Sequence, residues 1–224
     1  MFSGTFALKT TLDTPVRAPM PLQQLANLVS TRRILVSRIF GLLFFVVVLM
    51  TESAHEGSLI SAALFLGGLV LAGIAIVGRL WCSLYISGYK DSQLITTGPY
   101  SISRNPLYFF SLLGFAGIGF STETLTLGVA LSLLVLIGYL PVMRREEKVL
   151  RSKFGAEFDQ YCAQTPLLIP NFAKFNEPDT YVVNPRLFRR TMGDVVWFIW
   201  FIGIIGFVEA LHEYHYFDPL FALP

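Results

Sequence analysis

Residues 59–80 read LISAALFLGGLVLAGIAIVGRL and are apolar almost throughout. A helix needs about 20 mostly apolar residues to cross roughly 30 Å of hydrocarbon. This stretch therefore predicts a transmembrane helix from about Leu59 to Leu80. A helix is the expected form because lipid leaves no partner for an unpaired backbone amide or carbonyl.

The composition of the whole chain agrees with a membrane protein. Of its 224 residues, 54% are hydrophobic and only 14% are charged, and the mean hydropathy is +0.59. A soluble domain carries about 25% charged residues. A soluble globular protein is therefore excluded. The net charge of +2 says little about partners, and we expect a membrane environment rather than nucleic acid.

Four further apolar stretches predict membrane helices: Ile34–Met50, Leu107–Phe120, Leu125–Met143 and Val195–Leu211. Residues 107–120 are short for a span, so a half-inserted or buried helix is the alternative there. Residues 121–124 predict a tight hairpin between the third and fourth helices. Glycines in the second and third stretches suit close helix packing in lipid: Gly67, Gly68, Gly73, Gly78, Gly114 and Gly117. The expected fold is an all-α integral membrane protein with about five transmembrane helices and a cytoplasmic cofactor-binding segment.

The basic residues predict how the helices are oriented. All 17 lysines and arginines lie before or early in the first span, between the second and third, or between the fourth and fifth. Residues 51–58, residues 121–124 and the tail after Leu211 contain none. Because cytoplasmic loops are enriched in Lys and Arg, we expect a cytoplasmic N-terminus and a non-cytoplasmic C-terminus. An even number of spans would break this pattern.

The N-terminal segment, residues 1–33, has no secretory signal and is expected in the cytoplasm. Part of the stretch Pro21–Arg38 is amphipathic, which fits either a surface helix or a solvated lead-in. The two cysteines, Cys82 and Cys162, both lie in predicted cytoplasmic segments, so we expect no disulfide.

The first cytoplasmic segment, Cys82–Arg104, leads into LITTGPYSISRNPLYFF, residues 94–110. Gly98 and Pro99 predict a turn, and Pro106 suits the first turn of the next helix. Arg104 then lies at the membrane surface beside the N-terminal end of a helix, which favours anions. The alternative is an interfacial belt, in which Arg104 and its flanking tyrosines Tyr100 and Tyr108 only anchor the helix.

The second cytoplasmic segment, Arg144–Asp194, follows Met143 and begins RREEKVLRSKFGAEFDQYCAQTPLLIPNF. An apolar stripe at spacings of three to four predicts one helix from Arg144 to Tyr161 that leaves the membrane. Glu146 and Glu147 lie at the membrane exit, where unpaired acids are costly to desolvate. A simple charged collar is the alternative for these two residues.

Sequence motifs of soluble enzymes are absent from the chain. It has no Walker A loop, no GxGxxG after a strand and no GxSxG. The histidines, His55, His212 and His215, are all predicted on the non-cytoplasmic side, so none can act as a cytoplasmic base. His212 and His215 supply only two ligands on a tail, and we expect no metal site.

The combination of GPYSISRNPLYFF, a membrane hairpin and EEKVLRSKFGAEFDQYCAQTPLLIP resembles the isoprenylcysteine carboxyl methyltransferase and phospholipid methyltransferase superfamily. The resemblance covers about Gly88 to Pro170. It implies a methyltransferase core over residues 34–170, with a linker and fifth helix over 171–224. It also implies that S-adenosylmethionine binds in a cytoplasmic pocket, and that a lipid-like or lipidated acceptor enters from the bilayer.

The resemblance also implies roles for particular residues. One wall of the cofactor pocket is expected from Gly98, Pro99, Tyr100, Arg104, Asn105, Pro106 and Tyr108. Glu147, with Glu146 beside it, is expected to be the acid that contacts the cofactor or orients the acceptor, and the expected catalytic residues are Arg104, Glu146 and Glu147. A lid over the cofactor is expected from Phe154, Gly155, Tyr161 and Pro166. Arg144 and Arg145, with Arg104, are candidates to hold a carboxylate acceptor. An amine acceptor must lose a proton, for which Glu146 or Glu147 is the candidate base.

Two departures from the superfamily pattern bear on the substrate. Asn105 stands where the isoprenylcysteine branch usually has His, and Phe158 replaces the first Tyr of the lid. Both weaken prenylcysteine as the substrate and favour a bacterial-type member in an inner membrane. Two other functions stay open. The pattern at Lys153–Gly155 and Tyr161–Cys162 is also similar to NADPH-dependent sterol reductases, and a non-enzymatic membrane protein can use the same scaffold.

Overall fold

The computed structural model describes residues 38–55, 57–87, 93–216 and 219–224. Residues 1–33, with their expected cytoplasmic and amphipathic character, lie outside these ranges. The chain divides into two compact units, Met1–Phe45 and Val46–Pro224. The contacts discussed below all belong to the second unit.

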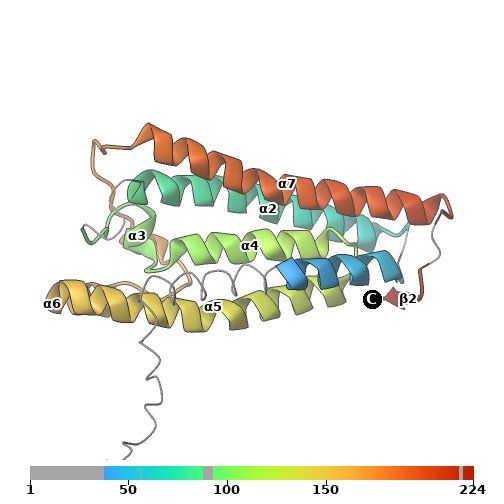
Figure 1. Ribbon diagram of the computed structural model, residues 1–224, viewed down its shortest axis with the longest axis horizontal. Helices are drawn as coiled ribbons and strands as arrows, with labels where there is room; N and C mark the ends of the chain where they lie inside the picture. The colour runs from blue at the N-terminus through green and yellow to red at the C-terminus, as the bar shows by residue number, and fades with distance from the viewer. Residues whose placement is uncertain (1–37, 56, 88–92, 217–218) are drawn as a thin grey trace, which may run out of the picture. The chain divides into compact units, whose positions relative to one another are not determined.

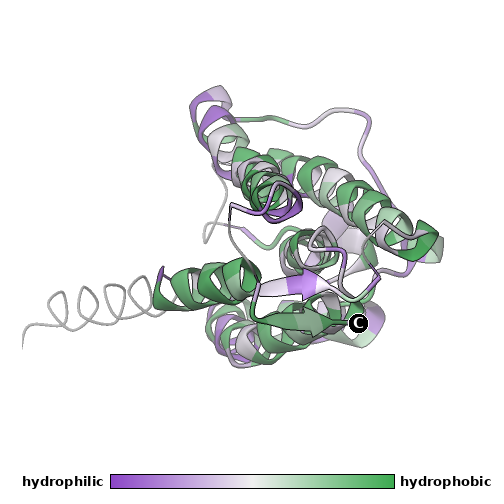
Figure 2. Cartoon of the chain, turned by 90° about the vertical axis from the view of Figure 1, so that its right-hand side faces the viewer, coloured by the Kyte–Doolittle hydropathy of each residue, from purple (hydrophilic) through white to green (hydrophobic). Residues whose placement is uncertain are grey.

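All five predicted apolar stretches form helices (Figure 1). The first covers Arg38–Met50, and the others are α2 (Leu59–Ile86), α4 (Pro106–Phe120), α5 (Leu125–Phe154) and α7 (Pro185–Glu213). In the described residues, α2, α5 and α7 are long and apolar enough to cross a membrane, whereas the other two are shorter. Hydrophobic residues dominate these helices (Figure 2). The chain is therefore an all-α integral membrane protein.

The long helices extend beyond their apolar stretches. α2 continues past Leu80 to Ile86, and α7 begins at Pro185 rather than near Val195. The side chain of Asn184 caps α7 by accepting hydrogen bonds from the amides of Arg186 and Leu187. The extension of α7 is polar and carries no hydropathy signal, even though capping and Pro at the first helical position favour it. The extension of α2, residues 81–86, stays largely apolar.

The prediction of one continuous helix over Arg144–Tyr161 is wrong. α5 runs without interruption to Phe154, and Gly155 then adopts a φ of +53°. That backbone conformation is favoured by glycine and ends the helix. A separate helix, α6 (Ala156–Gln164), follows. The apolar spacing continues across Gly155, which explains why the pattern did not reveal the break.

Helices α2 and α4 pack closely through glycine. A Cβ atom added to Gly117 would lie 2.6 Å from the carbonyl oxygen of Gly68, and one added to Gly68 would lie 2.7 Å from the carbonyl oxygen of Gly117. Gly78 and Gly114 likewise face the rings of Phe110 and Phe198, as the sequence predicts. Gly67 and Gly73 were wrongly assigned to packing surfaces, since a Cβ on either would meet nothing within 4 Å.

A short parallel strand pair closes one end of the helices. β1 (Thr51–Ser53) pairs with β2 (Phe221–Leu223) in the register Thr51 to Phe221. The carbonyl oxygen of Pro224 also accepts a 3.0 Å hydrogen bond from the amide of Thr126, at the start of α5. This pair was not predicted, because three residues are too few to show an alternating pattern.

The opposite end of the helices, called the site end here, carries the short helices (Figure 1). α3 (Pro99–Ile102) lies between the end of α2 and the start of α4. α6 follows α5, and the 3₁₀ helix η1 (Phe172–Lys174) contacts α3. The amide of Asn171 donates to the carbonyl of Ile102 at 2.8 Å. The two polar segments that the sequence singled out therefore meet here.

Candidate functional site

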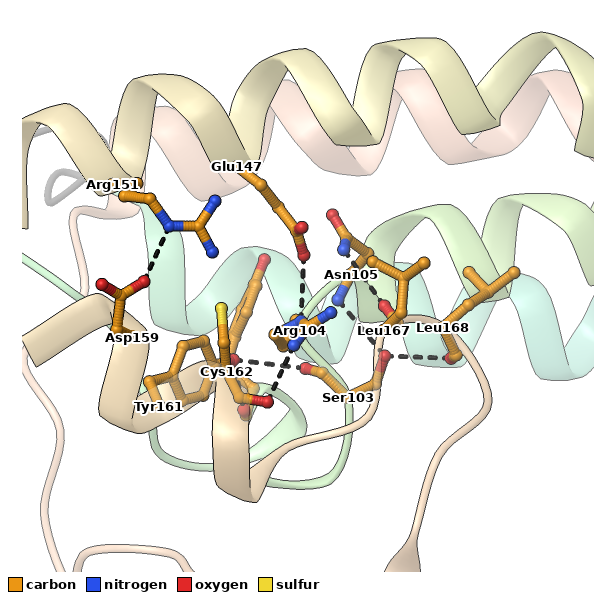
Figure 3. Close-up of polar contacts among 11 residues, drawn as sticks. Ser103, Arg104, Asn105, Glu147, Arg151, Asp159, Tyr161, Cys162, Leu167 and Leu168 are labelled. Atoms are coloured by element: carbon orange, nitrogen blue, oxygen red, sulfur yellow. Dashed lines mark hydrogen bonds and ion pairs between the residues drawn. The ribbon is translucent and has the colours of Figure 1, made fainter.

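An ion pair between Arg104 and Glu147 forms the centre of the site (Figure 3). Arg104 lies just before α4, and Glu147 lies on α5. Arg104 Nε and Glu147 Oε1 are 2.9 Å apart, and each side chain is 16% exposed. Ion pairs that are mostly withdrawn from water cost desolvation energy and are weak evidence for a purely stabilising role. The pair is therefore a candidate functional element.

Arg104 is also tied to the segment after α5. Its Nη1 donates to the carbonyl of Cys162 at 2.8 Å, and its amide donates to the carbonyl of Pro166 at 2.8 Å (Figure 3 shows the first of these). The guanidinium thus faces protein groups on α5 and α6. An interfacial belt would instead direct this side chain to the headgroups. The contacts favour the site interpretation of Arg104.

The facing atoms of the two charged groups are buried and are not well aligned for a hydrogen bond. Arg104 Nε and Glu147 Oε1 are buried atoms that make no aligned hydrogen bond to any group in the described structure, despite their close approach. Buried polar atoms are nearly always satisfied, so such atoms need an explanation. These two atoms pair with each other at 2.9 Å, and a ligand with both donor and acceptor groups can contact the part of each side chain that stays exposed. The residues present therefore fit a polar cofactor such as S-adenosylmethionine.

Gly98 sets the position of the predicted pocket wall. Its φ is +59°, and a Cβ atom there would lie 2.3 Å from the ring of Tyr85. Both the backbone conformation and the space favour glycine. Pro99 follows at the first position of α3 and is fully buried. The Gly98 amide donates to the carbonyl of Asn176 at 2.8 Å, so this wall also holds the linker before α7.

Asn105 acts on the closing segment of the chain. Its Nδ2 donates to the carbonyl of Leu167 at 3.0 Å, and the Oγ of Ser103, which is fully buried, donates to the carbonyl of Leu168 at 2.9 Å (Figure 3). The backbone carbonyl of Asn105 also accepts a hydrogen bond from the amide of Tyr108 at the start of α4. Asn105 therefore holds the segment after α6 against the start of α4, where Pro106 occupies the first helical position as predicted.

Tyr161 joins α6 to α3. Its hydroxyl donates to the carbonyl of Tyr100 at 2.7 Å. Burial raises the pKa of both tyrosines well above the ordinary value, so both hydroxyls stay protonated at neutral pH. Phe158, one turn earlier on α6, is almost fully buried and packs near Tyr161. Tyr161 can donate a hydrogen bond here but cannot act as a base.

An open pocket lies beside Arg104. It has a volume of about 680 Å³ and is formed by the end of α6 and the segment up to η1. Its lining includes the predicted lid residue Pro166 and two cations, Arg104 and Lys174. A second pocket of about 550 Å³ lies on the other side of Lys174 and includes Tyr161 and Glu157. Both volumes are within the range of small-molecule sites.

Other predicted site residues lie outside this arrangement. Arg144, Arg145 and Glu146 are exposed on α5, and only Glu147 faces Arg104. Tyr108 packs edge-to-face on Tyr139 of α5, with ring centroids 4.9 Å apart. Of the two adjacent acids, the fold therefore directs one into the site.

The linker before α7 contributes contacts that the sequence reasoning missed. The Tyr85 hydroxyl donates to Glu177, and the Tyr181 hydroxyl donates to the carbonyl of Tyr85. Phe175 packs on Trp81, with ring centroids 5.8 Å apart. Aromatic residues in an otherwise polar, proline-containing linker are the sequence feature that could have indicated this packing. The carbonyl of Cys162, by contrast, is a backbone group with no sequence signal.

Comparison with known proteins identifies the family. The sequence profile of the phospholipid methyltransferase family matches residues 58–157. The chain belongs to this family. The match runs from the cap of α2 into α6, and it includes both Arg104 and Glu147. The ion pair is therefore part of the family's own region and not of the C-terminal extension.

Two relatives match nearly the whole chain of this phospholipid methyltransferase family member. The nickel-cobalt-cadmium resistance protein NccN of Alcaligenes xylosoxydans xylosoxydans is 35% identical over 97% of this chain and all of its own length. The cobalt-zinc-cadmium resistance protein CzcN of Cupriavidus metallidurans is 37% identical over 84% of this chain and 87% of its own. No solved structure matches the chain. In the described residues, no three His, Cys, Asp or Glu side chains gather as a metal site.

Proposed function

We propose that the chain is an S-adenosylmethionine-dependent methyltransferase that acts on a lipid or lipidated acceptor at the cytoplasmic face of the membrane. The observation that carries this proposal is the mostly buried Arg104–Glu147 pair, whose Arg104 lines a pocket of about 680 Å³. The pair lies within the region that matches the family profile. Membrane helices on either side suit an acceptor that arrives from the bilayer.

The charges of the pair match the groups of the proposed cofactor. When bound, S-adenosylmethionine supplies a methyl group on a positively charged sulfur. Glu147 offers a carboxylate that can offset positive charge or accept hydrogen bonds, and Arg104 can bind a carboxylate. The Cys162 carbonyl fixes the guanidinium from its far side. Each charge therefore orients the other before any ligand arrives.

The remaining residues position the reactants and exclude water. Methyl transfer needs alignment more than proton movement, so a fixed geometry and a dry site can supply much of the rate. Asn105, Ser103 and Tyr161 hold α6 and the following segment over the start of α4. For an amine acceptor, Glu147 is the best-placed base, because Glu146 is exposed. A carboxylate or thiol acceptor is equally consistent with this arrangement.

We also propose that the site end faces the cytoplasm. The exposed basic residues Arg144, Arg145 and Lys148 on α5 and Arg189 and Arg190 on α7 support this orientation through the positive-inside rule. A water-soluble cofactor then reaches Arg104 from the cytosol. The strand pair β1–β2 and the C-terminus lie on the non-cytoplasmic side in this arrangement.

The proposal is tested by equilibrium binding of labelled S-adenosylmethionine to the purified full chain in detergent. We expect wild-type protein to bind it, and Arg104→Ala and Glu147→Ala each to weaken binding by at least about tenfold, the loss of one charge-assisted hydrogen bond. Arg189→Ala is the matched control, because Arg189 is exposed on α7. Binding of NADPH in place of S-adenosylmethionine would point to a membrane reductase, and binding of neither to a non-enzymatic protein.

The names of the two relatives suggest the setting of this activity. We propose that the methyltransferase contributes to resistance against divalent nickel, cobalt, zinc or cadmium. Its membrane location and pocket support an indirect role through methylation. In a bacterial host that lacks this gene, wild-type protein should improve growth at toxic cobalt concentrations, and Glu147→Ala should not. Equal protection by Glu147→Ala would show that resistance does not depend on methyl transfer and would contradict this proposal.

A further inference from the structure

A second polar cluster lies deeper in the membrane helices and has no part in the site described above. Arg79 of α2 donates through Nη1 to the hydroxyl of Ser111 on α4. Its guanidinium carbon also lies 5.8 Å from the ring centroid of Phe198 on α7. Tyr139 of α5 interacts with both Ser111 and the charge of Arg79. Four helices thus contribute to one cationic centre.

This cation has no acidic partner in the described part of the chain. The ion pairs there join Arg104 to Glu147 and Arg151 to Asp159. Arg79 Nε is a buried atom that makes no hydrogen bond. Charged residues within membrane helices are costly and usually pair with other charges or mark the path of a substrate. A guanidinium held only by a hydroxyl and an aromatic ring therefore lacks the anion that would neutralise it.

The depth of Arg79 suits the charged part of a membrane lipid. Arg79 closes the apolar stretch of α2, and it lies about two turns, or roughly 10 Å, before the end of the helix at Ile86. It is therefore near the edge of the hydrocarbon rather than at its centre. A side chain that only reached for water would extend toward Ile86, whereas the bond to Ser111 directs Arg79 toward α4.

One face of α5 connects this cluster to the Arg104–Glu147 pair. Tyr139, Met143 and Glu147 follow a spacing of four residues, so they lie on the same face of the helix. Met143 is fully buried, and Tyr108 of α4 packs on Tyr139. Along the axis, Tyr139 and Glu147 are separated by about 12 Å. The two centres therefore lie along one face of α5.

We propose that Arg79, with the hydroxyls of Ser111 and Tyr139, binds the anionic group of the membrane substrate, either a phosphate or a carboxylate. The methyl-accepting atom of the same molecule then faces the Arg104–Glu147 pair. Naming the ligand as the substrate rests on the proposed function, whereas the anion site itself does not. Arg79 takes the role that the sequence suggested for Arg144 and Arg145, which are exposed.

The test measures lipid binding to the purified full chain in neutral detergent, without S-adenosylmethionine, by native mass spectrometry. The probes are dioleoyl phosphatidic acid, oleate and dioleoyl phosphatidylcholine. We expect wild-type protein to bind phosphatidic acid or oleate at least about tenfold more strongly than phosphatidylcholine. Preference for phosphatidic acid alone identifies phosphate as the anion, and preference for oleate alone identifies a carboxylate.

Variants assign the preference to the cluster. Arg79→Gln should abolish it, Arg79→Lys should retain part of it, and the exposed control Arg189→Gln should leave it unchanged. Ser111→Ala and Tyr139→Phe should each weaken it a few-fold and are the decisive variants if Arg79→Gln does not fold. Wild-type preference in a folded Arg79→Gln, or in both hydroxyl variants, would overturn the proposal.

Binding of S-adenosylmethionine, measured on the same variants, separates this inference from the proposed function. Arg79→Gln should bind the cofactor as wild type does. If wild-type protein binds no S-adenosylmethionine but keeps an anion preference that depends on Arg79, the methyltransferase proposal fails and the anion site stands. If the cofactor binds and no anion preference exists, the anion-site proposal fails and the methyltransferase proposal stands.

Discussion

Residues at the site end have two different roles: some carry charge, and others shape the backbone. Arg104 and Glu147 carry charge that the fold holds mostly away from water, and removing either one would leave the other charge uncompensated. Gly98, Ser103 and Asn105 carry no charge and shape the backbone around that pair. The structural role of these uncharged residues can be tested by stability measurements that are independent of any ligand.

Gly98→Ala should destabilise the protein. The added Cβ would require an unfavourable positive φ and would lie 2.3 Å from the Tyr85 ring, so we expect a loss of about 1–3 kcal/mol. Gly138→Ala is the matched control, since a Cβ there meets nothing within 4 Å and alanine favours an α-helix. Thermal unfolding in detergent measures both, and equal melting temperatures would contradict the assigned role of Gly98.

Tyr161→Phe should change how stability depends on pH. Loss of the 2.7 Å hydrogen bond to the Tyr100 carbonyl should cost about 1 kcal/mol at neutral pH. Burial raises the pKa of Tyr161 above the ordinary value of 10.0, so its neutral form is favoured in the folded state. Stability in wild type is therefore unaffected below pH 10 and falls as pH rises through the folded pKa. Unfolding followed across this range should show a smaller alkaline loss in Tyr161→Phe; an identical profile would argue against a buried Tyr161.

At the scale of elements, α2 and α4 are held by direct backbone approach at Gly68 and Gly117. Gly117→Ala should lower stability by about 1–3 kcal/mol, because its Cβ would lie 2.6 Å from the Gly68 carbonyl oxygen and the helices would have to separate. Gly67→Ala, one residue from the contact and with nothing within 4 Å, should be neutral. Denaturation in mixed micelles compares the two variants, and similar effects would show that α2 and α4 do not pack through this face.

The elements that could be predicted from sequence are those with a strong local signal. Apolar length located five apolar helices, three of which are long enough to cross a membrane, and Pro106 marked the start of α4. The polar start of α7 could not be located, since hydropathy falls there while the helix continues. The strand pair and the linker contacts of Tyr181 and Glu177 depend on residues far apart in the chain, which single-sequence patterns do not relate.

The same distinction holds within the candidate site. The motif order predicts that Arg104, Asn105, Tyr161 and Glu147 belong to one site, and the structure connects the first three to the closing segment or to α3. The resemblance also favoured Glu147 over Glu146 as the acid in the site, and Glu147 is the one that pairs with Arg104. It could not single out Arg79, whose partners come from three other helices.

In the proposed orientation of the whole molecule, the two ends of the helices face opposite sides of the membrane. A reporter fused after Pro224 should give a non-cytoplasmic signal, because the basic residues lie at the site end. A matched reporter inserted in the exposed segment 178–180 of the linker should give a cytoplasmic one. Signals from the same compartment for both fusions would require a different number of spans.

The central claim is that the Arg104–Glu147 pair belongs to a binding site for S-adenosylmethionine. Its most direct test is equilibrium binding of the labelled cofactor to purified wild-type protein and to Glu147→Ala, with thermal unfolding to show that both are folded. We expect saturable binding by wild type that is at least about tenfold weaker in Glu147→Ala. Absence of binding by folded wild-type protein, or equal binding by the variant, would contradict it.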